Sequence, residues 1–423
     1  MRDLAKEINE SFWPALYDKS EISILYGGAG SGKSYAASQK LIVRAFNEPG
    51  HRFIVARKIG RTLRQSVFQR IKSQLAAWEL LPFCMVNKSD MVITTCTGSE
   101  FVFVGVDDVD KLKSIDEISG AWIEEATEFT FDDFLQLLLR VRGDTLAGYA
   151  QILLTFNPIL ETHWLNEKLF KEPPMEWNVS IHHSTVEDNP RVSERYVRTL
   201  DGLKNLSPEF YNVYRLGKWG NFAGRVFQDP VEIDEFPRVS ELELTAFGLD
   251  FGFNNPCAFI RIGIDKYDPV AQTLDLYVDE VVYESGLTTP QLNEAMRAEF
   301  DPDEIDEMVY GDSEAPGEIS ELADAGWPIV SCTKGPGSVR AGISALMKCR
   351  VFATKRSVNF LREWKTYCWA KDREGKMLDV PVKAFDHSID AVRYAVRDSL
   401  SQLSGGFGLS GGPDDEEDID DVA

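Results

Sequence analysis

The stretch that decides the fold is GGAGSGKS, residues 27–34. Its spacing follows the phosphate-loop pattern G-x-x-x-x-G-K-[ST], in which backbone N–H groups wrap phosphates at the start of a helix. Apolar residues at 22–26 precede the loop as a strand should, and 34–46 can form the helix that follows. We therefore expect a strand–loop–helix unit that binds a nucleotide. The nucleotide-binding residues that it predicts are Gly27, Gly28, Ala29, Gly30, Ser31, Gly32, Lys33 and Ser34.

Two adjacent acidic residues follow a second apolar run, in AWIEEA at 121–126. With a phosphate loop upstream, Lys33 is expected to neutralise the β- and γ-phosphates and Ser34 to hold Mg²⁺. Glu124 would then bind the magnesium, and Glu125 would orient and deprotonate the attacking water. The pattern therefore predicts ATP hydrolysis rather than phosphate transfer to a small substrate.

The next apolar run ends in TFNP, residues 155–158. Thr155 and Asn157 are placed to sense the γ-phosphate and to pass its loss to the neighbouring segment. A strand that simply ends in an Asn-Pro turn is the structural alternative.

Length and composition favour a two-domain protein of the reducing cytosol. At 423 residues the chain exceeds the size at which one core usually stops growing. Its six cysteines contain no C-x-x-C pair, so we expect packing residues rather than disulfides or a zinc site. The first ten residues lack an apolar signal region, and no stretch approaches the ~18 apolar residues of a membrane span.

The net charge of −23 argues against nucleic acid as a partner, but its distribution does not. Residues 51–72 hold seven basic residues and no acidic one, and residues 331–373 hold ten basic residues against Glu363 and Asp372. We expect two separate positive surfaces, with solvated faces as the simpler alternative.

The order of apolar runs and helical patterns indicates an α/β protein. Because the apolar runs are continuous rather than alternating, the first sheet should be mostly parallel and covered on both faces. The strands that we expect first lie at 52–57, 100–106, 120–126 and 151–158, and a second α/β unit begins at 245–253. The predicted segments are an ATPase domain at 1–178, a lid or linker at 179–227, a second domain at 228–404 and a disordered acidic tail at 405–423.

Three aspartates of the second domain stand where a charge is unexpected. Asp250 lies in the apolar run TAFGLDFGF, Asp312 ends MVYGD, and Asp390 lies on a helix that can pack on a sheet. A buried carboxylate costs several kcal/mol unless it is paired or bound to a metal. Three such groups can hold two Mg²⁺ or Mn²⁺ ions about 4 Å apart for phosphodiester cleavage.

Glu280 and His387 are further candidates for this second site. Glu280 ends the run LYVDE and would add a fourth metal-binding carboxylate, while His387 lies one turn from Asp390. A structural role is equally compatible with either residue. The motif GLDFG also occurs in sugar kinases, but here Phe253 and two asparagines replace the Gly and Thr or Ser that continue that motif.

The order of all these motifs resembles the large terminase subunit of tailed bacteriophages, of the PBSX-like group, over nearly the whole chain. The motifs that carry the resemblance are the P-loop, I-E-E, T-F-N-P, S-T-x-x-D-N-P, G-K-W-G, L-D-F-G, G-D-S and D-H-S-I-D-A-V-R-Y. The resemblance implies a RecA-like ATPase that drives duplex DNA into the procapsid, and an RNase H-like nuclease that cuts the concatemer. It also implies roles for Lys33, Ser34, Glu124, Glu125 and Thr155 in the ATPase, and for Asp250, Asp312, His387 and Asp390 in the nuclease.

One position departs from the family pattern. The family's loop often carries an arginine where this chain has Ala29. An arginine that stabilises the transition state must then come from elsewhere in the chain or from a neighbouring subunit. The candidates that the sequence offers are Arg57, Arg61, Arg64 and Arg142.

The resemblance further implies duplex DNA, the portal protein and the small terminase subunit as partners, in the cytoplasm of the host cell. It implies a homo-oligomeric ring on the portal and a monomer in isolation. The acidic tail would dock on these partners or shield the DNA surface. The alternatives are a helicase–nuclease of DNA repair, or an ATP-binding module without catalytic activity.

Overall fold

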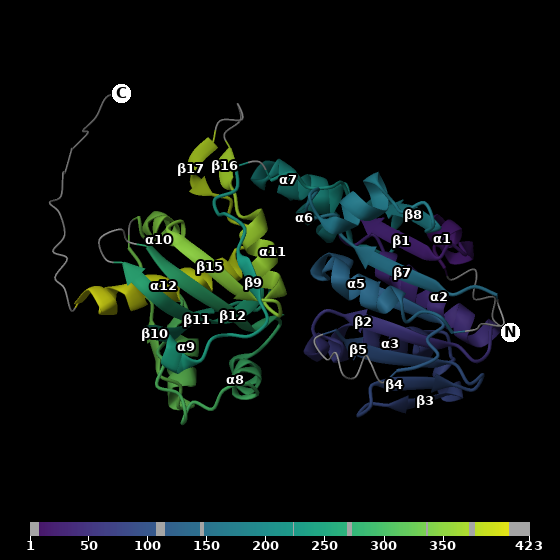
Figure 1. Ribbon diagram of the computed structural model, residues 1–423, viewed down its shortest axis with the longest axis horizontal. Helices are drawn as coiled ribbons and strands as arrows, with labels where there is room; N and C mark the ends of the chain where they lie inside the picture. The colour runs from purple at the N-terminus through teal and green to yellow at the C-terminus, as the bar shows by residue number, and fades with distance from the viewer. Residues whose placement is uncertain are drawn as a thin grey trace. The chain divides into compact units, whose positions relative to one another are not determined.

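The computed structural model describes residues 8–106, 115–143, 148–222, 224–268, 273–335, 337–371 and 377–405. These residues form two compact units, which we describe separately (Figure 1). Unit 1 extends to Gly224 and also takes in Cys368–Ala384, while unit 2 comprises Arg225–Tyr367 and the chain from Phe385 onward. The predicted tail lies outside the described residues beyond Gly405. No helix of the described segments has the length and apolar content needed to cross a membrane.

Unit 1 is built on a sheet whose described strands run in the order β3-β4-β5-β2-β6-β7-β1-β8. The strands from β5 to β8 in this order are parallel, and β3 and β4 are antiparallel. The prediction of a mostly parallel α/β sheet is therefore confirmed. The strands are β1 (Ile22–Gly27), β2 (Arg52–Arg57), β3 (Cys84–Asn87), β4 (Val92–Thr95), β5 (Glu100–Gly105), β6 (Gly120–Glu124), β7 (Gln151–Phe156) and β8 (Val179–Ser184).

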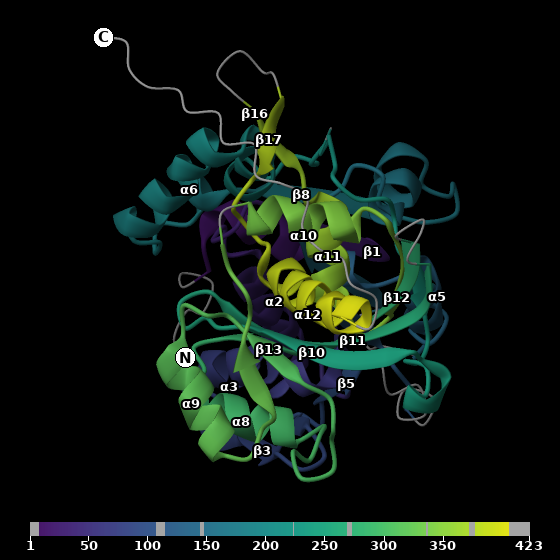
Figure 2. The same cartoon turned by 90° about the vertical axis from the view of Figure 1, so that its left-hand side faces the viewer.

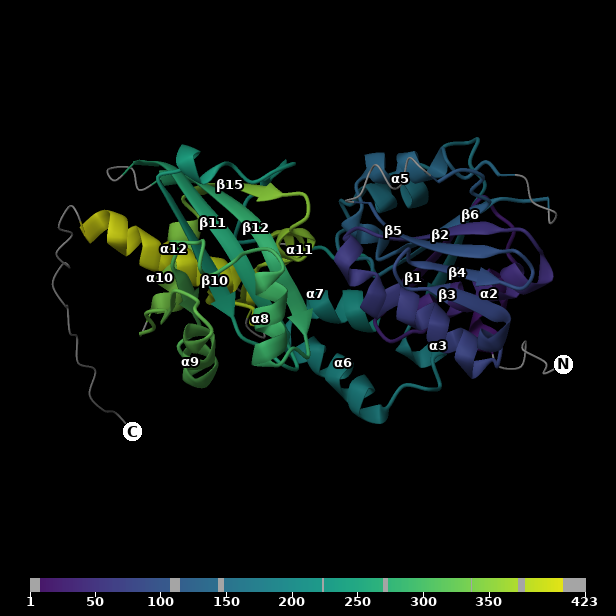
Figure 3. The same cartoon turned by 90° about the horizontal axis from the view of Figure 1, so that it is seen from below.

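Helices cover both faces of this sheet (Figure 3). On one face, α2 (Lys33–Asn47) and α3 (Gln69–Ala77) pack against Phe53, Phe101 and Trp122. On the other face, α5 (Phe131–Leu138) packs against a second set of strand residues. Burial of both faces explains why these strands read as continuous apolar runs.

The segment predicted as a lid begins with a strand of the same sheet. The predicted boundary at residue 178 falls just before β8, and this strand pairs in parallel with β1. Two helices follow, α6 (Glu194–Leu206) and α7 (Pro208–Phe210). Unit 1 also contains the hairpin of β16 (Trp369–Lys371) and β17 (Met377–Pro381), although these residues lie inside the predicted segment 228–404.

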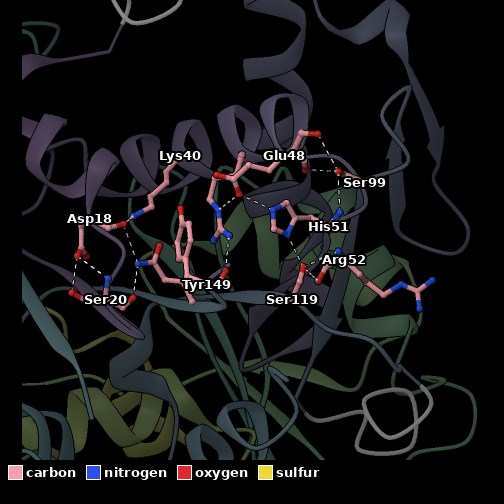
Figure 4. A network of polar contacts seen from close by, with 12 residues as sticks. Asp18, Ser20, Lys40, Glu48, His51, Arg52, Ser99, Ser119 and Tyr149 are labelled. Carbon is pink, nitrogen blue, oxygen red and sulfur yellow. Dashed lines mark hydrogen bonds and ion pairs between the residues drawn. The ribbon is translucent and has the colours of Figure 1, made fainter. Parts of the chain in front are cut away.

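Figure 4 shows a polar network that includes Asp18, Lys40 and His51. Asp18 and His51 lie just before β1 and β2, so the network is at the end of the sheet opposite the phosphate loop, which follows β1. Lys40 of α2 is buried and donates to the backbone oxygens of Ala15, at 2.8 Å, and Asp18. The imidazole of His51 contacts Ser119 Oγ at 2.9 Å and Glu48 Oε2 at 2.7 Å. These contacts fix the far half of the helix that starts at the phosphate loop.

The carboxylate of Asp18 is ionised within this network. Burial alone would raise its pKa, but hydrogen bonds from His182, Ser180 and Ser20 outweigh burial and hold the pKa well below its usual range. Ser20 donates to Asp18 Oδ1 through its backbone nitrogen at 3.0 Å and its hydroxyl at 2.7 Å. The charged form of Asp18 therefore stabilises the folded state.

We expect Asp18→Asn to lower the free energy of unfolding by about 1–3 kcal/mol at pH 7. Because the folded pKa is depressed, this contribution is complete above the unfolded pKa of about 3.9 and decreases progressively as the pH falls from there towards the folded pKa, so it should be smaller at pH 3.5 than at pH 7. Urea denaturation at pH 7 and at pH 3.5 measures both values. Asp132→Asn, an exposed aspartate on α5, is the matched control. An equal loss at both pH values would contradict the assignment.

Unit 2 contains a sheet whose described strands run in the order β14-β13-β10-β11-β12-β15-β9. A central antiparallel meander, β10-β11-β12, is flanked by parallel strands on both sides. The strands are β9 (Val231–Ile233), β10 (Leu244–Asp250), β11 (Pro256–Asp268), β12 (Thr273–Ser285), β13 (Val309–Gly311), β14 (Ile329–Ser331) and β15 (Cys349–Thr354). The helices are α8 (Thr289–Arg297), α9 (Pro316–Asp324), α10 (Ser338–Leu346), α11 (Val358–Thr366) and α12 (His387–Gly405).

The last helix crosses the centre of this sheet. Figure 2 shows α12 over β10 and β11, with α8 and α9 on the opposite side. The approach is close because β10 has a glycine here: a Cβ atom at Gly248 would lie 1.9 Å from the backbone oxygen of Ala391. The alternation along β10 then directs Asp250 to the α12 side and Leu249 to the core on the other side.

Candidate active sites

The phosphate loop joins β1 to α2 as predicted. Gly30 and Gly32 adopt left-handed backbone angles, with φ of 71° and 96°, which glycine adopts without strain. Lys33 is buried at the first position of α2, and its Nζ atom donates to the backbone oxygen of Gly28 at 2.9 Å. The loop is thus folded around its own lysine.

The lid segment lies directly on this loop. Gly28 N and Ala29 N donate to the backbone oxygens of Ser184 and Tyr214, at 2.9 and 2.8 Å. Asn189 Nδ2 donates to Gly30 O at 2.7 Å. The loop amides and the backbone of the predicted lid segment are therefore in direct contact.

The acidic pair stands on the neighbouring part of the sheet. Glu124 ends β6 and is buried, and its carboxylate accepts a hydrogen bond from the hydroxyl of Thr155 on β7. Trp122 Nε1 donates to the same hydroxyl at 2.8 Å. The structure therefore brings Thr155 against Glu124, whereas Asn157 is buried with an Nδ2 atom that has no partner among the described residues.

Glu125 turns the chain away from β6 in a left-handed conformation, with φ 53° and ψ 55°. Such a conformation is strained for a residue with a side chain, and strained residues concentrate at functional sites. Burial and the charge of Glu125 raise the pKa of Glu124. Burial lowers the pKa of Lys33, and Glu125 and Glu124 oppose that effect. Lysine and both glutamates thus lie within electrostatic reach of one another.

In unit 2, Asp250 and Asp312 lie at the same edge of the sheet. Asp250 ends β10, and Asp312 follows β13, its parallel neighbour. The backbone nitrogen of Asp312 donates to Leu249 O at 3.0 Å, which ties the two strand ends together. Tyr394 of α12 donates to Asp312 Oδ2 at 3.1 Å.

The first turn of α12 brings the other two candidates to this edge. His387 Nδ1 contacts Asp250 Oδ2 at 2.9 Å. Asp390, one turn further on, forms an ion pair with Arg393 at 2.9 Å, and Asp312 forms one with Lys334 at 2.5 Å. The structure therefore brings Asp250, Asp312, His387 and Asp390 together at this edge of the sheet. Asp250 pairs with His387, Asp312 with Lys334 and Asp390 with Arg393.

The site carries an excess of negative charge. Burial, with the nearby carboxylates of Asp390 and Asp312, raises the pKa of Asp250 to about 6, although His387 opposes the shift. Asp386, which sequence analysis missed, has a pKa raised to about 7 by burial and by Asp390. It directly precedes α12 in the motif D-H-S-I-D, so its position was visible in the sequence.

These residues fit divalent cations by their chemistry. Carboxylate oxygens are the ligands that Mg²⁺ and Mn²⁺ prefer in proteins. Across the described residues, however, no three His, Cys, Asp or Glu side chains are arranged to enclose one ion. Lys334 and Arg393 instead neutralise Asp312 and Asp390. The clustered negative charge is thus present and is offset in part by these two cations of the protein.

Glu280 has a different environment from the aspartates. It is fully buried on β12, and its two carboxylate oxygens accept hydrogen bonds from Asn359 Nδ2 at 2.7 Å and Phe360 N at 2.8 Å. Both donors belong to the first turn of α11, so Glu280 caps that helix. These contacts support the structural alternative for this residue.

In addition to Glu280, a second buried carboxylate fixes the start of a helix, and the sequence did not single it out. Glu363 of α11 is fully buried and accepts from Ser388 N at 2.7 Å and from Tyr283 OH at 2.5 Å. The Ser388 hydroxyl is a further donor. Glu363 thereby holds the start of α12, the turn that presents His387 and Asp390.

We expect Glu363→Gln to lower the free energy of unfolding by about 1–3 kcal/mol, because a glutamine cannot accept all these hydrogen bonds in place of a carboxylate. Displacement of the first turn of α12 should also slow DNA cleavage. Chemical denaturation and a plasmid-cleavage assay measure the two effects. Glu321→Gln, an exposed glutamate on α9, is the control and should change neither.

About half of the basic residues in the two basic segments form ion pairs within the described part of the chain. In residues 51–72, Arg52, Arg57 and Lys58 pair with Glu100, Glu128 and Asp133. In residues 331–373, the pairs include Lys334–Asp312, Arg350–Asp275, Lys355–Asp234, Arg356–Asp279 and Lys365–Glu232. Much of the positive charge that these sequences suggested is therefore neutralised locally.

A phosphate loop on a mostly parallel sheet, joined to an acidic site on an RNase H-like sheet, defines an ATPase–nuclease fusion. Residues 19–218 match the family described as "Phage terminase large subunit", and residues 250–398 match the "Terminase RNAseH like domain". The chain belongs to the phage terminase large-subunit family, and the resemblance found in the sequence is confirmed. It carries the ATPase and nuclease domains of that family.

Curated relatives extend over most of the chain. The PBSX phage terminase large subunit of Bacillus subtilis strain 168 is 27% identical, with 93% of this chain and 94% of the relative covered. The terminase large subunit of Bacillus phage SPP1 is 28% identical, with coverage of 92% and 93%. A solved structure of the large terminase from a thermophilic bacteriophage is 22% identical, covers 93% of this chain and 97% of its own, and has a TM-score of 0.47.

Proposed function

We propose that ATP hydrolysis in unit 1 drives duplex DNA into a procapsid, and that unit 2 cuts the concatemeric genome with divalent metal ions. The observation that carries this proposal is the presence of two separate acidic sites at sheet edges. One holds Lys33, Glu124 and Glu125, and the other is built around Asp250 and Asp312. Membership of the terminase family supports combining them in one packaging enzyme.

In the ATPase site, the loop amides and Lys33 bind the phosphates of ATP. Ser34 and Glu124 would hold Mg²⁺, which supplies charge neutralisation on the phosphates when bound. Glu125 orients the attacking water and accepts its proton. Thr155, which donates to Glu124, is placed to register the change at that carboxylate when the γ-phosphate leaves.

In the nuclease site, Asp250, Asp312 and Asp390 would hold Mg²⁺ or Mn²⁺, which activates water and stabilises the leaving oxygen when bound. His387 holds the carboxylate of Asp250 through its Nδ1 contact. Lys334 is placed to neutralise a DNA phosphate once Asp312 is engaged elsewhere. The protein would contact the phosphates of the DNA backbone, so cleavage requires no base-specific recognition.

Duplex DNA, the portal protein and the small terminase subunit are the partners that this function needs. A homo-oligomeric ring on the portal would couple several copies of unit 1 to one duplex, and a monomer would be the free form. The work takes place in the cytoplasm of the infected cell.

Displacement of a triplex-forming oligonucleotide from linear duplex DNA tests this function. The full chain should release the third strand in an ATP-dependent manner without separating the duplex, and Lys33→Ala should not. Release of single strands from the duplex itself would favour a helicase–nuclease instead. A wild-type chain that neither turns over ATP nor displaces the third strand with the DNA and the portal protein present would refute the motor.

A further inference from the structure

The ATPase site lacks a cation on the loop besides Lys33, because Ala29 occupies the middle of the glycine-rich turn. During phosphoryl transfer, charge spreads over the oxygens of the γ-phosphate, and a well-placed arginine stabilises that charge strongly. The structure offers such an arginine on α3, outside the four positions that the sequence suggested.

Arg70 lies in the first turn of α3, which packs beside α2 in unit 1. Its guanidinium carbon is 5.1 Å from the ring centroid of Tyr35, the residue that follows Ser34 of the phosphate loop. The side chain is half-buried, and its Nε atom is buried with no hydrogen-bond partner among the described residues. Arg70 thus lies against the first turn of α2, next to the phosphate loop, and its Nε can still donate a hydrogen bond.

The charge of Arg70 affects the pKa values of two residues of the ATPase site, Lys33 and Glu124. Burial lowers the pKa of Lys33, and the charges of Glu125 and Glu124 oppose that effect. The positive charge of Arg70 lowers the pKa of Lys33 further. Burial and Glu125 raise the pKa of Glu124, while Arg57 and Arg70 counteract them. The contact with Tyr35 sets Arg70 beside the start of α2, and its charge acts on both Lys33 and Glu124, between which the γ-phosphate would lie.

The arginines that the sequence suggested are placed differently. Arg57 contacts both carboxylate oxygens of Glu128 at 3.3 Å. Arg64 is exposed and donates to the backbone oxygen of Lys88 at 3.2 Å, and Arg142 is exposed. The side chain of Arg61 lies outside the described part of the chain.

We infer that Arg70 is the arginine, supplied by the same chain, that stabilises the γ-phosphate as ATP is hydrolysed; this rests on the ATPase activity proposed above. Water forms a bond to the γ-phosphorus and gives its proton to Glu125. The bond from this phosphorus to the bridging oxygen breaks, and the electron pair stays on ADP. Arg70 donates to the γ-phosphate oxygens, where negative charge redistributes during this step.

ATP turnover of the full chain tests the inference with Arg70→Ala, Arg70→Lys and Arg64→Ala. Arg70→Ala should lower the turnover number at least about 100-fold and leave KM within about threefold, because the arginine acts mainly in the transition state. Arg70→Lys should recover part of the loss, since lysine keeps the charge without the planar fork. Arg64→Ala, the matched control, should behave as wild type.

Binding of a fluorescent ADP with and without aluminium fluoride separates catalysis from structure. Wild type should bind ADP more tightly when aluminium fluoride is present, and Arg70→Ala should lose this gain while keeping its affinity for ADP alone. Turnover of Arg70→Ala within threefold of wild type would overturn the inference, as would equal loss of ADP binding and turnover. If the wild-type chain itself did not hydrolyse ATP, both the proposed ATPase activity and this inference would be refuted.

Discussion

Glu125→Gln is expected to lower the ATP turnover number of the full chain by about 10²–10⁴-fold, the usual contribution of a positioned general base. The glutamine side chain keeps the size of glutamate but cannot accept the proton of the attacking water. Because Glu125 lies beyond β6 rather than in the loop that binds the phosphates, affinity for ATP should change little. Steady-state hydrolysis and direct ATP binding measure the two quantities.

The chain offers a close control for this substitution. Glu117 is exposed and has φ 58°, close to the 53° of Glu125, and it stands before β6 whereas Glu125 stands after it. Glu117→Gln therefore repeats the same chemical change at a residue with a similar positive φ, at the other end of β6. Turnover of Glu125→Gln comparable to that of Glu117→Gln would rule out the base assignment.

Asp250→Asn is expected to reduce DNA cleavage by at least about 100-fold, since even partners outside the first coordination sphere of a metal matter by 10–100-fold. The substitution removes a charge from the centre of the acidic cluster and changes the hydrogen bond with His387. The side chain is buried and its pKa is raised to about 6, so loss of its charge should not unfold the domain.

This second prediction is checked by conversion of supercoiled plasmid to linear DNA in Mg²⁺ or Mn²⁺. ATP hydrolysis by the same preparation should equal that of wild type, which shows that the protein is folded. Asp324→Asn, an exposed aspartate on α9, should cut normally. Cleavage by Asp250→Asn at the wild-type rate would mean that the acidic cluster has a structural role.

Sequence reasoning succeeded where the signal was local. The phosphate loop, the Glu124–Glu125 pair and Asp250 each lie at the end of a continuous apolar run, and the structure places each at the end of a buried strand. Such a run and its terminal polar residue are encoded within about ten residues, so no tertiary information is needed to find them.

The remaining features depend on partners that are remote in sequence. Glu363 is held by Ser388, 25 residues away, and by Tyr283, 80 residues away. Arg70 acquires its place only when α3 packs beside α2. Likewise, the sequence places Arg356 in a positively charged segment, but in the folded chain Arg356 forms an ion pair with Asp279. Spacing along the chain does not encode these juxtapositions.

Plasmid cleavage and ATP hydrolysis measured side by side test the central claim, that one chain carries two independent active sites. The proteins to compare are wild type, Lys33→Ala and Asp250→Asn, with Mg²⁺ or Mn²⁺ and the same DNA. We predict a crossed pattern: Lys33→Ala cuts DNA without hydrolysing ATP, and Asp250→Asn hydrolyses ATP without cutting. Loss of both activities in either variant, or cleavage that persists in Asp250→Asn, would contradict the account.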